Sequence, residues 1–150
     1  MPEKAIIDTS VLIALERISM LDVHCRIYSH IILPESVVSE FGTLSIDCYS
    51  SEKVKSSMIR LLVFDLNLGR GEAECIALAS EIGLRLVLDD LKALKVADNL
   101  GLKITGTIGI LLKAESLTII DSAYDKAKEL RDKGFYISDQ ILDNISSYRK

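Results

Sequence analysis

The sequence predicts an α/β fold in which helices cover both faces of a parallel sheet. Short apolar runs of strand length alternate with helical patterns from one end of the chain to the other. The connections between them are short, which favours right-handed crossovers between parallel strands. The strand runs are continuously apolar, as expected for strands buried on both faces.

The expected strands are short runs that end at a polar, turn-forming or helix-starting residue. They are residues 5–7 (AII), 30–33 (HIIL), 61–66 (LLVFDL), 85–88 (RLVL) and 103–105 (KIT). Asp8 follows the first run, Pro34 the second and Asp89 the fourth. A proline suits the first turn of a helix, and an aspartate suits an N-cap, so each strand leads directly into a helix.

The expected helices show apolar residues at a helical period between these strands. They are residues 10–18, 35–41, 69–83, 91–101 and 106–116, followed by the amphipathic segments 121–133 and 138–150. The polar, serine-rich stretch 43–58 is interpreted as a mobile helical connection. No internal repeat or linker divides the pattern.

Length and composition indicate one globular domain. The chain has 150 residues, of which 49% are hydrophobic and 27% charged. No run approaches the ~18 apolar residues of a membrane span. Asp8 interrupts the first apolar block, which is unlike a signal peptide. We therefore expect a single domain over residues 1–150, located in the cytoplasm and without a membrane segment.

Charge and cysteine content limit the chemistry. The net charge is −4, so a nucleic-acid partner must be held by a local patch or through metal ions. The three cysteines are odd in number and lack a C-x-x-C spacing, which predicts reduced, mostly buried thiols. Only two histidines are present, which gives a histidine-based mechanism little support.

Acidic residues follow two of the predicted strands. Asp8 ends the first strand, and Asp89 and Asp90 end the fourth. Ligands of open parallel sheets bind at the carboxyl ends of strands. Each aspartate could instead cap the helix that follows it.

Glutamates on two predicted helices can join these aspartates. Glu40 lies beside the apolar stripe of its helix, in the last turn, where the helix dipole disfavours a negative charge. Glu72 and Glu74 begin the helix 69–83 on different sides, so only one of them can face a common pocket. Which one does so is left open by the helical geometry.

Four or five carboxylates at one strand edge predict a metal site. Such a cluster requires a cation to remain ionised, because like charges raise each other's pKa. Ligation by oxygen alone suits Mg²⁺ or Mn²⁺. A divalent ion held in this way activates water for attack on a phosphodiester, which is nuclease chemistry.

Other phosphate-handling classes fit the sequence less well. GRGEAE (69–74) opens like a dinucleotide fingerprint, but Glu74 occupies the third glycine position and would repel a pyrophosphate. No P-loop motif is present. Asp8-Thr9-Ser10 lacks the second acid of phosphoaspartate hydrolases, which leaves a phosphotransfer domain as a weaker alternative.

Four motifs in this order resemble those of the PIN domain family, most closely its VapC-like branch. They are AIIDTS near the N-terminus, VVSEF near residue 40, GRGEAECIALA near residue 72 and LVLDD near residue 89. The later segment LKALKVADNLGLKITGTIGILLKA looks like one typical of prokaryotic members. The resemblance covers roughly residues 4 to 145.

The resemblance implies an α/β/α ribonuclease that depends on Mg²⁺ or Mn²⁺. Asp8 matches the family's first acid, and Ser10 matches the small hydroxyl residue near it. Glu40 matches the second acid and Glu72 the helix-borne acid. The last acid falls on Asp89 or Asp90, and Leu88 stands where the family often has threonine or serine.

The resemblance also implies partners. Many relatives are toxins that a small antitoxin protein silences, and these form homodimers with a groove for RNA. The amphipathic segments 51–60 and 121–133 could supply partner-binding surface. The alternative is a catalytically inactive PIN-fold module that binds RNA or protein.

Overall fold

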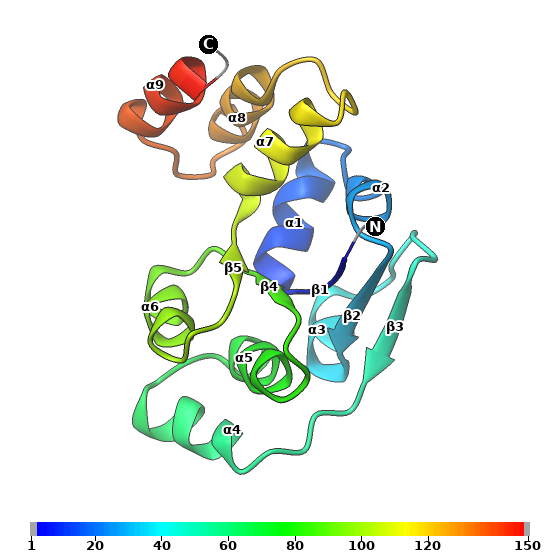
Figure 1. Ribbon diagram of the computed structural model, residues 1–150, viewed down its shortest axis with the longest axis vertical. Coiled ribbons are helices and arrows are strands. Elements are labelled where there is room, and N and C mark those ends of the chain that lie inside the picture. The colour runs from blue at the N-terminus through cyan, green and yellow to red at the C-terminus, as the bar shows by residue number, and fades with distance from the viewer. Residues whose placement is uncertain (1–2, 149–150) are drawn as a thin grey trace.

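A computed structural model describes residues 3–148, which form a parallel sheet flanked by helices (Figure 1). In this part of the chain the sheet has five strands in the order β3-β2-β1-β4-β5. They are β1 (Lys4–Ile7), β2 (His30–Pro34), β3 (Tyr49–Glu52), β4 (Arg85–Val87) and β5 (Ile104–Thr105). Each neighbouring pair is parallel, which confirms the predicted fold class.

Helices cover both faces of this sheet. They are α1 (Thr9–Arg17), α2 (Val23–Ile27), α3 (Glu35–Phe41), α4 (Met58–Arg60), α5 (Arg70–Ile82), α6 (Leu91–Asn99), α7 (Thr107–Ser116), α8 (Ala123–Asp132) and α9 (Asp139–Tyr148). Helix α5 packs against β1, β2 and β4, whereas α1 and α7 lie on the opposite side of the sheet (Figure 1). Helices α8 and α9 stack beyond α7.

The central strands are buried, as their apolar sequences predict. Ala5, Ile6 and Ile7 of β1 and Leu86 and Val87 of β4 have no exposed surface. Burial of these side chains removes apolar surface from water on both faces and so stabilises the sheet.

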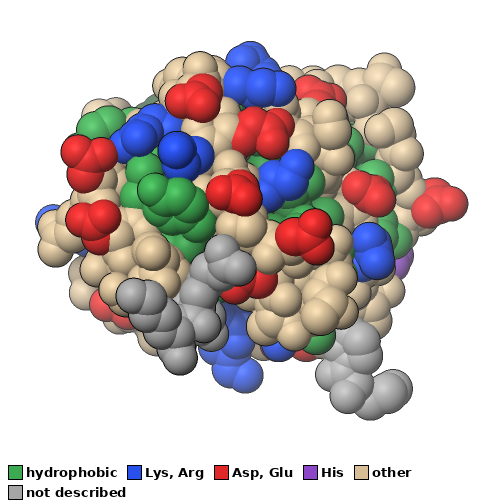
Figure 2. All heavy atoms as spheres, turned by 90° about the horizontal axis from the view of Figure 1, so that it is seen from above, with side chains coloured by type: hydrophobic (Ala, Val, Ile, Leu, Met, Phe, Trp, Pro, Cys, Tyr) green, Lys and Arg blue, Asp and Glu red, His purple; other side chains and the backbone are tan. Residues whose placement is uncertain are grey.

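The surface at the α8 and α9 end carries charges of both signs. Figure 2 shows acidic and basic side chains interspersed over this face. It therefore offers no broad basic platform for a nucleic acid. Among residues 3–148, no helix combines the length and the apolar character needed to span a bilayer.

The prediction of a strand at residues 61–66 is wrong. Residues Leu61–Asp65 form a π-helical turn, η1, that continues α4. Ile59 and Leu62 are buried three residues apart, whereas Leu61 is 50% and Phe64 76% exposed. This is helical spacing, and a short apolar run does not distinguish it from a strand.

The stretch interpreted as a helical connection contains the missing strand instead. Strand β3 lies within residues 43–58 and pairs with β2 alone, at the edge of the sheet. Its sequence, YSSE, is largely exposed. An edge strand faces solvent along one side, so it can be polar and lacks the apolar signal of a central strand.

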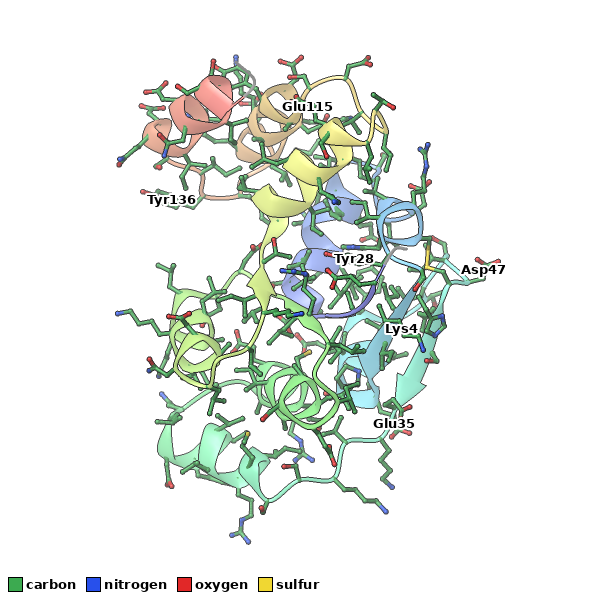
Figure 3. All side chains as sticks on the ribbon, viewed as in Figure 1. Lys4, Tyr28, Glu35, Asp47, Glu115 and Tyr136 are labelled. Atoms are coloured by element: carbon green, nitrogen blue, oxygen red, sulfur yellow. A yellow bond between two sulfur atoms is a disulfide. The ribbon has the colours of Figure 1, made fainter. Side chains whose placement is uncertain are left out.

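The expectation of three reduced thiols is also wrong. Cys25 and Cys48 form a disulfide with a Cα–Cα distance of 5.7 Å, beside Asp47 in Figure 3. The cause is tertiary: the backbone N–H of Ile31 in β2 donates to the carbonyl oxygen of Cys48 at 3.0 Å, and this pairing places Cys48 next to α2. Cys75 is a free, buried thiol, as expected.

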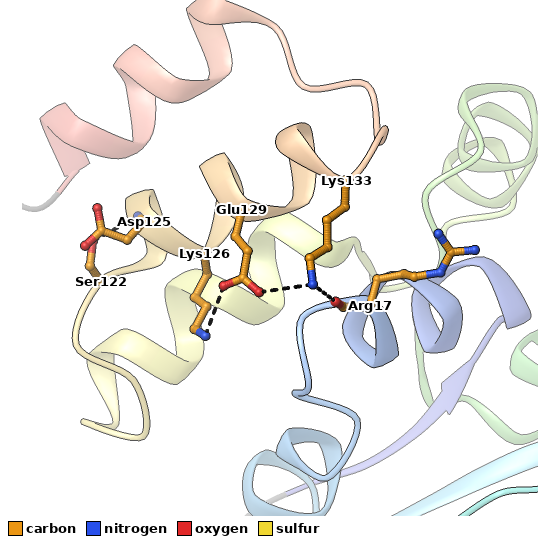
Figure 4. Close-up of polar contacts among 6 residues, drawn as sticks. All are labelled: Arg17, Ser122, Asp125, Lys126, Glu129 and Lys133. Carbon is orange, nitrogen blue, oxygen red and sulfur yellow. Dashed lines mark hydrogen bonds and ion pairs between the residues drawn. The ribbon is translucent and has the colours of Figure 1, made fainter.

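The C-terminal helices are tied to α1 through Lys133 (Figure 4). Its Nζ donates to the carbonyl oxygen of Arg17, the last residue of α1, at 2.8 Å. The same ammonium group lies 3.8 Å from Oε2 of Glu129, and Nζ of Lys126 lies 3.3 Å from Oε1. A cation at the end of α1 complements the helix dipole.

Candidate active site

Strands β1 and β4 bring their terminal aspartates to one edge of the sheet. The two strands are paired in register, with Ile7 opposite Val87, and the backbone N–H of Asp8 donates to the carbonyl oxygen of Val87 at 2.9 Å. Asp89 and Asp90 follow Val87 two and three residues later and are exposed. Parallel pairing therefore places the acids of both strands together.

Asp8 is the buried acid of this group, with 3% of its surface exposed. Its Oδ2 accepts hydrogen bonds from Oγ and the backbone N–H of Ser10, at 2.9 and 3.4 Å, so it also caps α1. Burial raises the pKa of Asp8, and the charge of Asp89 raises it further, against the lowering effect of the hydrogen bonds from Ser10 and Thr9.

Glu40 reaches the same place from α3. Gly71 stands where α5 meets α3, and a Cβ added to it would lie 3.2 Å from Oε2 of Glu40 and 3.8 Å from Oδ1 of Asp8. The absence of a side chain at Gly71 thus leaves a small space that both carboxylates border.

The two glutamates at the start of α5, Glu72 and Glu74, have different surroundings in the structure. Burial raises the pKa of Glu72, and so do the charges of three other acids, namely Asp90, Asp8 and Glu40. Its Oε1 also accepts from the backbone N–H of Gly69 at 3.1 Å, as in a capping box. Glu72 is therefore the α5 acid that faces the group.

Glu74 has other partners. It is 5% exposed, and its oxygens accept from Oγ of Ser36 and Nε of Arg70, both at 2.8 Å. These contacts hold the carboxylate of Glu74 on the side of α5 that faces α3, beside Arg70.

Asp89 and Asp90 each cap a helix. Oδ1 of Asp89 accepts from the backbone N–H of Thr107 at 2.8 Å, and its Oδ2 accepts from Thr107 Oγ1. Oδ2 of Asp90 accepts from the backbone N–H of Ala93 at 3.0 Å. The charge of Asp89 acts on Asp8 and that of Asp90 on Glu72, so both border the group from different sides.

Three neighbours of the acids were not singled out as site residues from the sequence. Gly71 lies inside GRGEAE, and Thr107 follows the short strand β5. Cys75 lies one turn beyond Gly71 on α5, and its Sγ is 3.9 Å from Oδ1 of Asp8. Burial raises the pKa of the Cys75 thiol well above its usual value, and the nearby carboxylates add to this effect. The helical spacing from Gly71 was the one available signal for Cys75.

The donor set fits a hard divalent cation. The acids that converge here offer carboxylate oxygens, the ligands that Mg²⁺ and Mn²⁺ prefer. The space at Gly71, which a Cβ would fill, lies against two of these carboxylates. Within residues 3–148, no three Asp, Glu, His or Cys side chains already stand close enough to form a finished metal site.

Comparison with known proteins agrees with this fold. The family model DUF3368, described as a PIN domain, matches residues 4–149. Neither the curated proteins nor the solved structures gave a match. A match over nearly the whole chain, together with the parallel sheet and the acids at its strand ends, shows that this chain belongs to the PIN domain family, whose fold is a nuclease fold.

Proposed function

We propose that this protein is a metal-dependent endoribonuclease that cleaves RNA phosphodiester bonds. The observation that carries the proposal is the approach of Asp8 and Glu40 to one space at Gly71. The charges of both also raise the pKa of Glu72. Because of this effect, these acids are placed together at a cost in stability, and such groups are typical of functional sites.

The proposed ligands of Mg²⁺ or Mn²⁺ are Asp8, Glu40, Glu72 and one or both of Asp89 and Asp90. A divalent ion there supplies a Lewis acid that activates water and stabilises the charge that develops on the scissile phosphate. The residues around the ligands hold them in place. Ser10 fixes the orientation of Asp8, and Thr107 fixes that of Asp89 through two hydrogen bonds.

A toxin role with a small antitoxin, and homodimer formation, are finer proposals. They rest on the resemblance to the VapC-like branch and on one surface. The helical segment Met58–Asp65 exposes Leu61 and Phe64, and such apolar side chains are typical of protein contacts. Growth arrest on expression of the wild type, but not of Asp8→Asn, would support the toxin role. The mass in solution tests the dimer.

A second candidate is an inactive PIN-fold module that binds RNA or protein. The carboxylates of Asp89 and Asp90 are engaged in helix caps, and no finished metal site is formed by residues 3–148. A protein that binds RNA but takes up no Mn²⁺ at millimolar concentration would favour this candidate.

The test is cleavage of a mixed-sequence single-stranded RNA with Mn²⁺, with Mg²⁺ and with EDTA. Asp8→Asn is expected to abolish cleavage and to weaken Mn²⁺ binding measured by calorimetry. Asp139→Asn is the matched control, because Asp139 lies on α9, is paired with Arg131 at 2.7 Å and has a 91% exposed side chain. Metal-independent cleavage, or full activity of folded Asp8→Asn, would overturn the proposal.

A further inference from the structure

A groove borders the acidic group on the other side of the α3–α5 contact. It has a volume of about 460 Å³ and is lined by Glu35, Ser36, Ser39, Lys53, Val54, Arg70 and Glu74. Figure 3 shows Glu35 beside the carboxyl ends of β2 and β3, where α3 begins. The groove therefore opens at the same edge of the sheet as the acids.

Arg70 is held in this groove by a buried carboxylate, that of Glu74. Its side chain is 70% exposed, whereas the side chain of Glu74, which accepts from its Nε at 2.8 Å, is only 7% exposed. Burying a carboxylate is costly unless it is paired and hydrogen-bonded. Ser36 supplies the second hydrogen bond to Glu74. A buried acid is thus used to fix the position of a surface arginine.

The guanidinium group keeps most of its donors available. Nε is engaged by Glu74, and no other hydrogen bond of the Arg70 side chain is formed with residues 3–148. An arginine has five N–H donors in a planar fork that matches the oxygens of a phosphate. Fixing the fork in advance reduces the entropy lost when it binds an anion.

The groove lies about one helical turn from the acids. On α3, Ser36 contacts Glu74 and Glu40 approaches Gly71, so the two contacts are four residues apart along one helix. Four residues span about 6 Å of helix axis. The groove with Arg70 is thus next to the acids, as a site for a neighbouring phosphate of the same strand must be.

We infer that Arg70, positioned by Glu74 and assisted by Lys53, binds a backbone phosphate of single-stranded RNA next to the bond that is cleaved. This inference rests on the proposed function. It also explains how a chain of net charge −4 can hold RNA, since one fixed guanidinium acts locally where no broad basic field is needed. Glu35 lines the same groove, and its negative charge repels the phosphate.

The experiment measures binding of a fluorescent, mixed-sequence single-stranded RNA by Asp8→Asn protein in Mg²⁺, over a series of salt concentrations. Adding Arg70→Ala is expected to raise Kd about 3- to 10-fold and to lower the salt slope by about 0.7, the value for one phosphate contact on a single strand. Arg70→Lys is expected to keep the slope, because it keeps the charge. Glu35→Gln is expected to tighten binding.

A matched arginine controls for loss of surface charge. Arg131 pairs with Asp139 at the α8–α9 end, so Arg131→Ala is expected to leave Kd and slope unchanged. An unchanged slope in folded Arg70→Ala protein overturns the inference, and so does a parent protein that binds no RNA. If the parent binds RNA with the expected Arg70 dependence while wild type cleaves none, the phosphate contact of Arg70 stands and the proposed catalysis fails.

Discussion

The carboxylates of Asp8 and Glu40 border the same small space beside Gly71. Oδ1 of Asp8 and Oε2 of Glu40 lie 3.8 and 3.2 Å from the point that a Cβ on Gly71 would occupy. One acid comes from the end of β1 and the other from α3, while Gly71 belongs to α5. Three separate elements therefore shape the space in which we propose that a cation binds.

Gly71→Ala is expected to weaken Mn²⁺ binding by about 10- to 100-fold, as loss of a supporting group around a metal does. The added methyl group would press on Glu40 and fill the space between the two carboxylates. The free energy of unfolding is expected to stay the same or rise by up to about 1 kcal/mol, because alanine favours a helix. Calorimetric titration with Mn²⁺ and thermal melting in EDTA measure the two effects. Ser80→Ala, at an exposed position of α5, is the control. Wild-type Mn²⁺ affinity in Gly71→Ala would falsify this account of the glycine.

Asp8→Asn is expected to raise the Tm of the metal-free protein at neutral pH. The folded-state pKa of Asp8 is raised, so its ionised form destabilises the fold once the pH exceeds the unfolded value of 3.8. Asparagine retains the capping oxygen and removes the charge. The gain in Tm is expected to disappear as the pH falls below 3.8. Melting curves in EDTA at a series of pH values check this. A lower Tm for the variant at pH 7 would show that the carboxylate stabilises the fold.

His24 is expected to make the fold sensitive to acid. It has no exposed surface, and its Nδ1 and Nε2 have no hydrogen-bond partner among the described residues. Burial lowers the pKa of His24 from 6.5 to about 3. Its neutral form is therefore required in the fold, and stability is lost as the pH falls from 6.5 towards 3, by up to about 5 kcal/mol.

The variant His24→Leu is expected to remove this sensitivity. Leucine is apolar and of similar size, so it fills the site without leaving two polar nitrogens unsatisfied. Urea denaturation at pH 7.5 and pH 5 measures the difference. Equal losses of stability in wild type and variant between these two pH values would exclude His24 as the cause.

Reduction of the Cys25–Cys48 disulfide is expected to lower the free energy of unfolding by about 3 kcal/mol, since the bond closes a loop with a sequence separation of 23. Cys48→Ser in the absence of reductant is expected to have a similar effect. Melting with and without reductant measures it, and mass spectrometry after alkylation counts the free thiols. Three alkylated cysteines in unreduced protein would contradict the disulfide.

Much of the fold follows from local pattern. The strands near residues 5–7, 30–33 and 85–88 are correct because each is a largely buried apolar run bounded by a helix signal, and the half-buried strand near residues 103–105 is correct as well. The edge strand β3 and the helical segment 58–65 are the exceptions. Which side chains of these two segments need to be apolar depends on which side of the segment faces solvent. Only the assembled sheet decides that.

By itself, the sequence determined that this is an α/β chain with acids after its first and fourth predicted strands and with the ordered motifs of the PIN domain family. Tertiary structure alone decided that Glu74 holds Arg70, that Glu40 reaches Gly71, and that Cys25 pairs with Cys48. The physical reason is that pattern and propensity act over a few neighbouring residues. A contact between residues far apart in the chain depends instead on how helices and strands pack.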